Sequence, residues 1–466
     1  MKLRIYIGLG LITGMLLLAT DLQAQSWPTY RHDMARSGKS DAVLKMPMQE
    51  TFRFQSPHRP KPAWPGPAKR DAYNKVENLE PRLAFDRAFH IVGENGHIYF
   101  GSSADDQVRC LDGKTGKLIW NSFTEGPVRF APTLQGGRVY VGSDDGYAYC
   151  FNQKSGRQVW RFRAAERDVR VPGNGRLMSP WPVRTSLIVD KNTAYFCAGL
   201  FPSEGAWLCA LSAQSGKKKF QYPLSGTHPQ GYMLASRTRL YLPTGRGRPA
   251  VHERKNGAKI RDMSGQGGTF ALLVGDSLIY GPGKTGELGE FAGGSSDQVA
   301  TFHGLHMIVD GDLAWLHSGR DVSALHRTRF LRLTSEQRTL SARRKSLQEQ
   351  VTALRKKAKG KSKSAVGIKQ TRELEKIGKK LQKISADLPA CVLWRTPCDL
   401  RYEMVMARGV LLLGGDGEVQ AFSTKDGKKI WQAPVSGRAW GLAVVDDSLY
   451  VSTDEGVIHG FSGGVR

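Results

Sequence analysis

The sequence is poor in cysteine, and its six Cys fall in no arrangement that a haem or dithiol redox motif would use. There is no Cys-x-x-Cys pair, no two adjacent Cys and no Cys-x-x-Cys-His. Cys391 and Cys398 bracket an expected strand, which would hold them about 23 Å apart at about 3.3 Å per residue. They are therefore poor partners for each other, and we expect Cys110 and Cys150 to be buried free thiols.

Long apolar runs are missing after residue 24, since a helix that spans a bilayer needs about 20 apolar residues. Before that point, Lys2 and Arg4 precede an uncharged apolar run at residues 5–19, and Ala24 is a small residue at a plausible cleavage point. We predict a Sec-type signal peptide over residues 1–24, a periplasmic or secreted protein, and no membrane span after cleavage. A retained membrane anchor is the alternative.

Acidic residues are scarce: 42 Asp and Glu stand against 68 Lys and Arg, a net charge of +26. The imbalance is local. Residues 327–388 hold 19 Lys and Arg against 5 Asp and Glu, a net +14 and more than half of the excess. The basic charge therefore belongs to one segment, and it does not characterise the whole protein.

Glycine is abundant, with 53 residues, and it marks the turns of a repeat. In the clearest unit, residues 139–142 are expected as a strand, residues 144–146 (Asp-Asp-Gly) as a hairpin turn and residues 147–151 as the returning strand. Residues 154–156 (Lys-Ser-Gly) then form a second turn before a strand that ends in Trp160. This hairpin recurs eight times, at residues 98–110, 139–151, 194–210, 240–251, 277–291, 313–325, 410–422 and 449–461.

A spacing of about 40 residues is typical of four-stranded propeller blades, which pack around an axis because one sheet cannot bury both faces alone. We predict an all-β fold: an eight-bladed β-propeller with an inserted antiparallel α-helical hairpin. Seven blades are the alternative if the degenerate fifth unit is an elaboration. The residues assigned to the structural repeat are Gly116, Trp120, Gly156, Trp160, Gly216, Trp394, Gly427 and Trp431.

The last repeat stops before a closing strand, while residues 49–54 form a spare strand near the mature N-terminus. We infer that the two termini complete one blade and so remove a sheet edge. The domains expected after the signal peptide are an N-terminal lead-in at 25–84 that includes the closing strand, the propeller at 85–465, and a basic helical hairpin at 329–388 inserted in one blade.

The run Leu-Asp-Gly-Lys-Thr-Gly at 111–116, followed by Trp120, resembles the repeat of PQQ-like (quinoprotein-type) propellers, Ala-x-Asp-x-x-Thr-Gly-x-x-x-Trp, and the resemblance covers most of 85–465. The opening Trp-Pro-Thr-Tyr-Arg-His-Asp at 27–33, with Arg-Ser-Gly at 36–38, is similar to the lead-in of exported bacterial members. The family includes quinoprotein dehydrogenases and non-enzymatic relatives such as the outer-membrane assembly propeller. The resemblance thus implies the architecture and leaves the activity open.

The basic insert shows helical periodicity on both sides of the polar loop 359–364. Residues 334–337 fit a capping box that would start the first helix. Apolar side chains recur at three, four or seven residues and predict two helices packed along one seam: Leu333, Leu340, Leu347, Val351 and Leu354, then Leu374, Ile377, Leu381, Ile384 and Leu388.

Three interpretations compete for the cations of this insert: a solvated helical face, contact with an acidic envelope protein or anionic polymer, and nucleic-acid binding. The last is disfavoured because no aromatic residues interleave the charges for base stacking. We expect the insert to project from the rim of a monomeric propeller.

The usual site of a propeller is the mouth of its channel, where the innermost strands begin. The candidate ligand-binding residues there come from seven different stretches: Arg129, Trp181, Tyr232, Gln266, His303, Arg401 and Trp440. If Arg129, Arg401 and Arg438 converge, their repulsion favours an anion, and a nearby aromatic ring would offer a flat wall. Arginines scattered in separate ion pairs are the alternative.

The resemblance implies what a working quinoprotein would need: PQQ held with Ca²⁺ by carboxylate and amide side chains, a catalytic Asp and, in many alcohol-oxidising members, adjacent cysteines. The chain lacks adjacent cysteines, and carboxylates are sparse at the expected mouth, with Glu403 the main exception. No catalytic residue and no metal ligand is assigned. PQQ with calcium stays an open cofactor. The favoured function is a binding or assembly scaffold of the cell envelope, and the alternative is a small PQQ-dependent or other ligand-binding oxidoreductase.

Overall fold

The computed structural model describes residues 25–66, 68–71, 76–79, 81, 83–173, 175–245, 247–283, 286–357 and 368–464. Within these residues six antiparallel sheets have four strands each. In chain order they are β4 (Val92–Glu94), β5 (His97–Gly101), β6 (Gln107–Asp112), β7 (Leu118–Phe123); β8 (Thr133–Gln135), β9 (Arg138–Gly142), β10 (Tyr147–Asn152), β11 (Gln158–Arg163); β14 (Ile188–Asp190), β15 (Thr193–Ala198), β16 (Trp207–Leu211), β17 (Lys218–Pro223); β18 (Leu234–Ala235), β19 (Arg239–Leu242), β20 (Ala250–Glu253), β21 (Lys259–Asp262); β22 (Phe270–Val274), β23 (Ser277–Gly281), β24 (Glu287–Phe291), β25 (Gln298–His303); and β26 (His306–Asp310), β27 (Leu313–His317), β28 (Asp321–His326), β29 (Val392–Pro397).

A seventh sheet has seven strands, because the long β33 pairs with β32 through its first half and with β34 through its second. Its strands are β1 (Met48–Gln55), β35 (Val457–Gly463), β34 (Ser448–Thr453), β33 (Lys429–Val445), β32 (Asp416–Ser423), β31 (Val410–Gly414) and β30 (Glu403–Ala407). The remaining elements are two hairpins, β2 (Ala68–Asp71) with β3 (Val76–Leu79) and β12 (Val171–Gly173) with β13 (Arg176–Met178), the 3-10 turns η1 (Pro202–Glu204) and η2 (Pro389–Cys391), and the helices α1 (Arg327–Lys357) and α2 (Ile368–Asp387).

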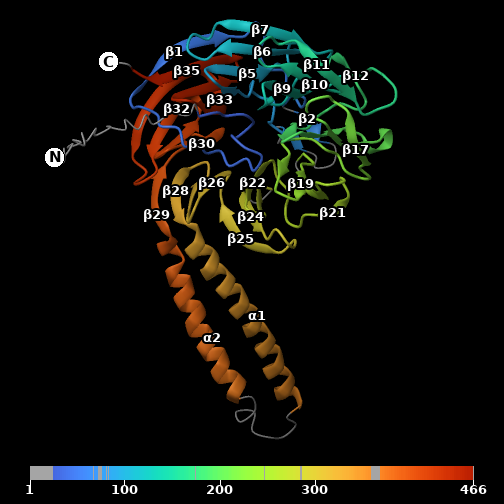
Figure 1. The fold of residues 1–466 in the computed structure, drawn as a ribbon. Helices are drawn as coiled ribbons and strands as arrows, with labels where there is room; N and C mark the ends of the chain where they lie inside the picture. Colours follow the sequence, from blue (N-terminus) through green and yellow to red (C-terminus); the bar gives the residue numbers. More distant parts are fainter. Residues whose placement is uncertain are drawn as a thin grey trace, which may run out of the picture.

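The sheets surround a central axis as a β-propeller, with the first strand of each four-stranded sheet innermost (Figure 1). In the seven-stranded sheet the inner positions are held by β30 and the second half of β33. Neighbouring inner strands contact one another: β4 contacts β8, β8 contacts β14, β18 contacts β22, β22 contacts β26, β26 contacts β30, and β33 contacts both β30 and β4. Apolar side chains fill the space between adjacent sheets, as where Tyr99 and Val108 pack with Val139 and Tyr149. All six cysteines are buried and unpaired.

The glycines and tryptophans of the repeat lock adjacent sheets together. Gly156 has a positive φ of 68°, and a Cβ built there would lie 2.6 Å from the Trp120 ring of the preceding sheet. The Trp120 indole N–H donates to the Gln153 carbonyl of the same turn at 3.0 Å. Only glycine fits this turn under the ring, which explains why both residue types recur. Equivalent pairs are Trp160 with Gly216 and Trp394 with Gly427.

The two ends of the chain meet in the seven-stranded sheet. The strand expected at residues 49–54 is β1, and it pairs antiparallel with β35. The Trp431 indole N–H donates to the Met48 carbonyl at 2.9 Å. Phe52 covers Gly116 in the first sheet as the tryptophans cover the other turn glycines. β1 therefore closes the ring and supplies the aromatic side chain, Phe52, that covers Gly116.

Residues 25–42, which we call the belt, run across one end of the channel. Their backbone hydrogen-bonds to Gly93, Leu134, Ala235, Leu273 and Met406 on inner strands, and the Gln25 carbonyl accepts from the Asp446 amide at the turn after β33. Side chains reach the two remaining sheets: Arg36 donates to Ser186 at 3.0 Å, and Lys39 pairs with Asp310 at 2.6 Å. The belt thus contacts every sheet of the ring and caps the channel.

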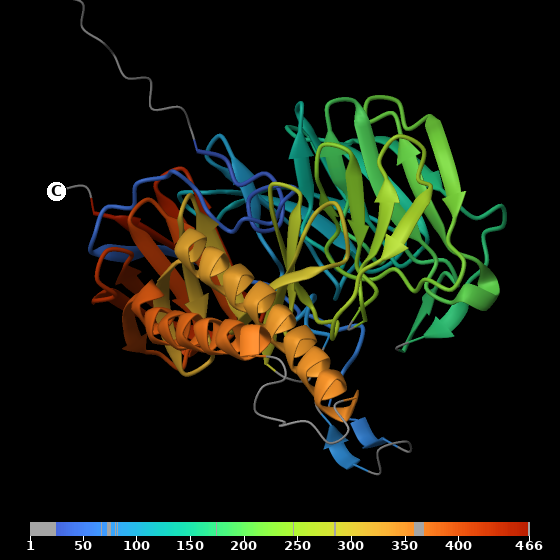
Figure 2. The ribbon, with the colours of Figure 1, turned by 90° about the horizontal axis from the view of Figure 1, so that it is seen from below.

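Two helices, α1 and α2, stand between β28 and β29 and extend side by side away from the sheets (Figures 1 and 2). We call them the arm. Leu333 and Ile384 join the core of the neighbouring sheets, while Leu347, Val351 and Ile377 are buried farther out. The described part of the chain contains no helix long and apolar enough to span a membrane.

The start predicted for the first helix is wrong. Helix α1 follows β28 directly and begins at Arg327, seven residues before Thr334. Thr334 lies inside the helix, where its hydroxyl donates to the Phe330 carbonyl at 2.9 Å instead of capping an end. Arg327 forms a buried ion pair with Glu290 of β24, which holds the helix start against the neighbouring sheet.

Candidate functional site

The channel contains a cavity of about 310 Å³, between the belt and the mouth where the inner strands begin. Strand starts that line it include Tyr232 just before β18, Phe270 of β22 and His306 of β26. Glu403 of β30 and Trp440 of β33 complete this side of the wall. Tyr30, Arg31 and Arg36 of the belt line one side of this cavity, and Leu83, Ala84 and Phe85 of the lead-in line it as well.

The belt supplies the floor. The Tyr30 ring stacks on Tyr232 with centroids 3.5 Å apart, and the Arg36 guanidinium lies 5.7 Å from the Tyr232 centroid. Arg36 is 1% exposed, and it donates to the carbonyls of Met233, Tyr30 and Asp33 and to the hydroxyls of Thr29 and Ser186. Burial lowers the pKa of Arg36 to about 10, so the side chain is still protonated at neutral pH.

Beside Arg36, a second buried arginine is neutralised. Arg31 pairs with Glu403 and also donates to the Met404 carbonyl at 2.9 Å. The remaining Glu403 oxygen accepts from the Tyr30 hydroxyl at 3.2 Å. This carboxylate is therefore fully engaged in tying the belt to β30, and it is the one carboxylate among the described residues of the cavity lining.

Two histidines of the lining are neutral at physiological pH. Burial lowers the pKa of His90 to about 4. Burial also lowers the pKa of His306, with smaller contributions from His317 and Arg31. The His306 ring stacks on His317, its cross-strand partner, with centroids 6.1 Å apart. These side chains add no charge to the pocket.

Arg401, Tyr402 and Trp440 form the outer wall. The Tyr402 and Trp440 rings are 4.5 Å apart. Arg401 is exposed, and no hydrogen bond or ion pair joins it to any other residue in the described parts of the chain. It is therefore a cation at the mouth of the pocket that is free to meet a ligand.

One sector of the mouth is filled by a buried charge network. Asp144 of the β9–β10 turn accepts from Arg129 at 2.6 Å and from Arg184 at 3.0 Å, and Arg129 also reaches Asp86 at 2.8 Å. Although burial opposes ionisation, Arg184 and Arg129 lower the pKa of Asp144. With two acids and two bases, the network is neutral and closed. The lead-in covers it, since Arg129 also donates to the Lys61 carbonyl.

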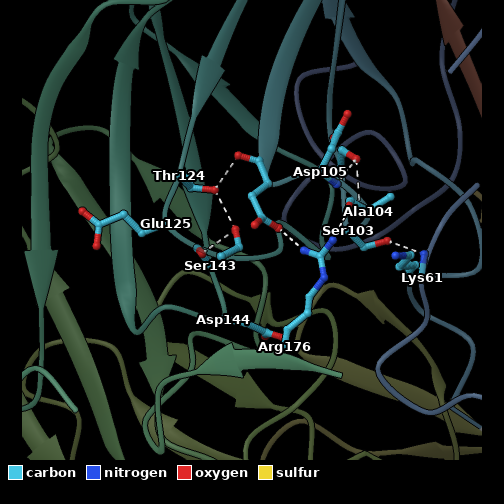
Figure 3. Close-up of polar contacts among 12 residues, drawn as sticks. Lys61, Ser103, Ala104, Asp105, Thr124, Glu125, Ser143, Asp144 and Arg176 are labelled. Carbon is cyan, nitrogen blue, oxygen red and sulfur yellow. Dashed lines mark hydrogen bonds and ion pairs between the residues drawn. The ribbon is translucent and has the colours of Figure 1, made fainter. Parts of the chain in front are cut away.

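Figure 3 shows the polar contacts that surround this network. The Lys61 amide donates to the Ser103 hydroxyl at 3.0 Å, and Arg176 of β13 pairs with Asp106 and donates to the Ala104 carbonyl. Ser143 and Thr124 both donate to the Gly126 carbonyl, at 2.9 and 2.7 Å. These bonds join the first two sheets, the lead-in and the β12–β13 hairpin, so this sector is structural.

Of the seven candidate residues, the pocket brings together Tyr232, Arg401 and Trp440. Arg129 is buried in the closed network instead, because Asp86 and Asp144 compensate its charge. Trp181 is buried against Trp207, and its indole N–H donates to the Glu204 carbonyl at 2.5 Å. These two placements at a ligand site are corrected by the structure.

Gln266 and His303 are also outside the pocket lining. Gln266 is exposed in the loop before β22. His303 ends the outermost strand β25, where its side chain is 83% exposed and lies 3.5 Å from Glu287. The predicted convergence of three arginines is wrong as well: Arg438 pairs with Asp416 and Asp454, Arg129 is buried, and Arg401 alone of the three lines the pocket.

Sequence reasoning missed the floor of the pocket. Tyr30, Arg31 and Arg36 stand in the opening stretch that resembled a family lead-in, and they were given no site role. The signal in this stretch is a cluster of polar and aromatic residues that lies outside any repeat. In the structure Arg36 and Gly38 of the same stretch have a positive φ. Such residues need partners elsewhere in the chain, although the sequence does not say where.

Comparison with known families places this fold. The family model described as "Outer membrane protein assembly factor BamB" matches residues 76–329 and 402–465, more than half of the chain. The chain belongs to this family. The unmatched stretch between the two ranges holds most of α1, all of α2 and the strand β29.

Curated relatives match only short stretches. The alcohol dehydrogenase (quinone) dehydrogenase subunit of Komagataeibacter europaeus is 33% identical over 95 residues, 17% of this chain and 13% of that protein. Quinoprotein ethanol dehydrogenase of Pseudomonas putida is 34% identical over 67 residues, 14% of this chain and 11% of the other. The chain thus spans about an eighth of the length of these relatives.

Solved structures share the fold at low identity. Quinohemoprotein alcohol dehydrogenase from Comamonas testosteroni aligns with a TM-score of 0.58 and 11% identity, over 95% of this chain and 81% of that one. A europium-containing methanol dehydrogenase aligns with a TM-score of 0.58 and 9% identity, over 94% and 98% of the two chains. These likenesses extend the fold assignment to nearly the whole chain.

The pocket does not fit PQQ held by calcium. Among the described residues, no group of three or more His, Cys, Asp or Glu is placed to hold a metal ion. Glu403, which a calcium ion would need, is engaged by Arg31 and Tyr30. We therefore derive no quinone chemistry from this site.

Proposed function

We propose that this protein is an exported, non-catalytic scaffold of the cell envelope: an eight-bladed propeller, with the seven-stranded sheet counted as two blades, that recruits an acidic partner protein through its arm. The signal peptide is removed near Gln25, where the belt begins. The observation that carries the proposal is the uncompensated charge of the arm. The family model's name, an outer-membrane assembly factor, supports the setting.

The arm is built to present cations. Helix α1 holds ten Lys and Arg against two acids, and α2 holds six against three. Within the described residues the arm forms two ion pairs, Arg327 with Glu290 and Arg343 with Glu373. Exposed arm cations without an ion pair in the described parts of the chain are Arg332, Arg338, Arg344, Lys345, Lys356, Lys369, Arg372, Lys376, Lys379, Lys380 and Lys383.

On α2 the cations form one continuous face. Lys369, Arg372, Lys376, Lys379 and Lys383 recur at alternating spacings of three and four, which places them along one side of a helix. The apolar side chains that recur at the same spacings face the other helix. A helix of 31 residues is about 46 Å long, so the arm carries this charge well beyond the propeller rim. Such a face attracts a complementary acidic surface.

A pull-down from envelope extract tests the proposal. The bait is the mature protein, compared with a variant in which residues 337–380 are replaced by a short Gly-Ser loop. This cut keeps the base of the arm, where Leu333 and Ile384 pack on the sheets. A second bait, Lys376→Glu/Lys379→Glu/Lys383→Glu, keeps the arm but reverses the charge at three positions of its cationic face. The matched control, Lys154→Glu/Lys217→Glu/Lys425→Glu, makes the same change at exposed turns of the propeller.

We expect one set of acidic envelope proteins to bind the mature protein and the control, and to be lost from both arm variants. Identical partner lists for all four baits would contradict the proposal. Retention of material that survives protease treatment of the extract would identify an anionic polymer and make the acidic-protein assignment wrong.

A second candidate is a ligand-binding oxidoreductase that uses the channel mouth. The cavity with aromatic and cationic walls favours it, and the engaged Glu403 counts against a metal-dependent version. Titration with PQQ and Ca²⁺, followed by tryptophan fluorescence and dye-linked oxidation of alcohols or sugars, separates the two functions. Saturable binding with turnover would replace the scaffold proposal.

A further inference from the structure

The channel pocket carries more positive than negative charge. Its described lining contains four ionised side chains: Arg31, Arg36, Arg401 and Glu403. Arg31 and Glu403 neutralise each other. No carboxylate lies within ion-pair distance of Arg36 or Arg401 in the described parts of the chain, and the carboxylate of nearby Asp33 accepts from the amide and hydroxyl of Ser37. The negative charge of Asp33 stabilises the Arg36 guanidinium electrostatically, so the charge left over in the lining is that of Arg401.

The walls around this charge are largely flat and apolar. Five aromatic rings line the space, those of Tyr30, Tyr232, Phe270, Tyr402 and Trp440, beside polar side chains such as Gln230 and Thr269. Arg401 is exposed at the mouth, and an anion that binds it beside these rings excludes water and so strengthens the electrostatic interaction.

We propose that this pocket binds a small aromatic carboxylate. The carboxylate meets Arg401 in a charge-assisted, two-point contact, and the flat ring lies among the aromatic side chains. This inference is independent of the arm and does not require catalysis. It assigns a ligand to the propeller itself.

Benzoate and benzamide are the probes, because they share shape and differ in charge. Calorimetric titration of the mature protein should show saturable one-site binding of benzoate and none of benzamide. Arg401→Gln should weaken benzoate binding about 10-fold or more, since a hydrogen bond to a charged group is lost, and Arg401→Lys should retain part of the affinity. The matched control is Arg161→Gln, which alters an ion-paired arginine outside the lining and should leave the affinity within about 2-fold.

A second variant tests the wall separately. Trp440→Leu removes a flat ring without touching a charge, so the preference for benzoate over acetate should shrink while both still bind. Thermal unfolding of each variant confirms that the protein is folded. Equal binding of benzamide and benzoate, no saturable benzoate binding, or an unchanged affinity in Arg401→Gln would each overturn the inference. The pull-down described above is unaffected by any of these results, so the two proposals fail independently.

Discussion

The belt and the arm are two segments outside the repeat, and their charged side chains are placed in opposite environments. In the belt, Arg31 and Arg36 are buried and make eight hydrogen bonds between them. In the arm most cations are exposed and unpaired. A buried charge with several hydrogen bonds fixes structure, because removing it leaves partners unsatisfied. An exposed, unpaired charge costs the fold little and remains available to a partner.

Removing a belt charge should have the largest effect on the stability of the protein. Arg36→Met leaves five acceptors without their donor, three of them backbone carbonyls, and each buried unsatisfied group costs about 1–3 kcal/mol. We expect the free energy of unfolding to fall by about 4 kcal/mol or more, measured by urea denaturation. Arg338→Met in the exposed arm should change it by less than about 0.5 kcal/mol. Similar small effects from both would mean that the belt does not hold the ring.

Truncating one buried apolar side chain in each region distinguishes the stability of the ring from that of the arm. Phe52→Ala opens a space beside Gly116 and Gly460 at the ring closure and should lower the free energy of global unfolding by about 3 kcal/mol. Leu347→Ala makes a comparable cavity in the arm, where Leu347 is 1% exposed. It should leave the unfolding midpoint of the propeller unchanged and reduce hydrogen-exchange protection of arm amides alone. A global loss in Leu347→Ala would show that the arm and ring unfold together.

Acid should weaken the closure of the ring and spare the arm. His459 of β35 accepts from the Ser436 amide through Nε2, so Nδ1 carries the proton and donates to Glu50 of β1 at 2.5 Å. Burial lowers the pKa of His459 below its usual 6.5, although Glu50 opposes the shift. The unfolded chain therefore binds the proton more readily, and stability present above pH 6.5 is lost as the pH falls below it. The thermal midpoint should drop between pH 7 and 5, and by less in His459→Gln. Equal drops would exclude His459.

The smallest effect is expected from neutralising arm charges. Replacing Lys376, Lys379 and Lys383 by Gln should change the unfolding free energy by no more than about 0.5 kcal/mol per site, because exposed, unpaired charges contribute little. The same variant should lose partner binding in the pull-down. A clear loss of stability would assign these lysines to the fold and remove the contrast with the belt.

The repeat could be read from the sequence because its chemistry is local. Gly156 and Trp160 are only four residues apart in the sequence. A turn with a positive φ that precedes a strand with an aromatic residue has few structural alternatives. The pairing of β1 with β35 also followed, since a missing strand and a spare one were both visible. The contacts of Arg36 with Met233 and Ser186 span more than 140 residues, and no local pattern reports them.

Side-chain direction at the mouth was likewise beyond the sequence. Arg129 and Arg401 both precede inner strands. Arg129 is buried in ion pairs with Asp86 and Asp144, whereas Arg401 forms no ion pair in the described parts of the chain. The position of His303 was misjudged for a simpler reason. Only Gly304 and Leu305 separate the outer strand β25 from the inner strand β26, so the two strands looked like one in the sequence.

The closing strand has a consequence for the order of folding. A ribosome releases Met48 before any of the propeller, but its partner Gly463 is made more than 400 residues later. Pairings so distant in sequence slow the folding reaction. The belt likewise forms its backbone hydrogen bonds to Met406 and Asp446 only after those residues have been synthesised. The first part of the chain to be synthesised is therefore among the last to find its place, and a chain that stops short of β35 keeps both an open ring and an unpaired N-terminal segment for proteases to recognise.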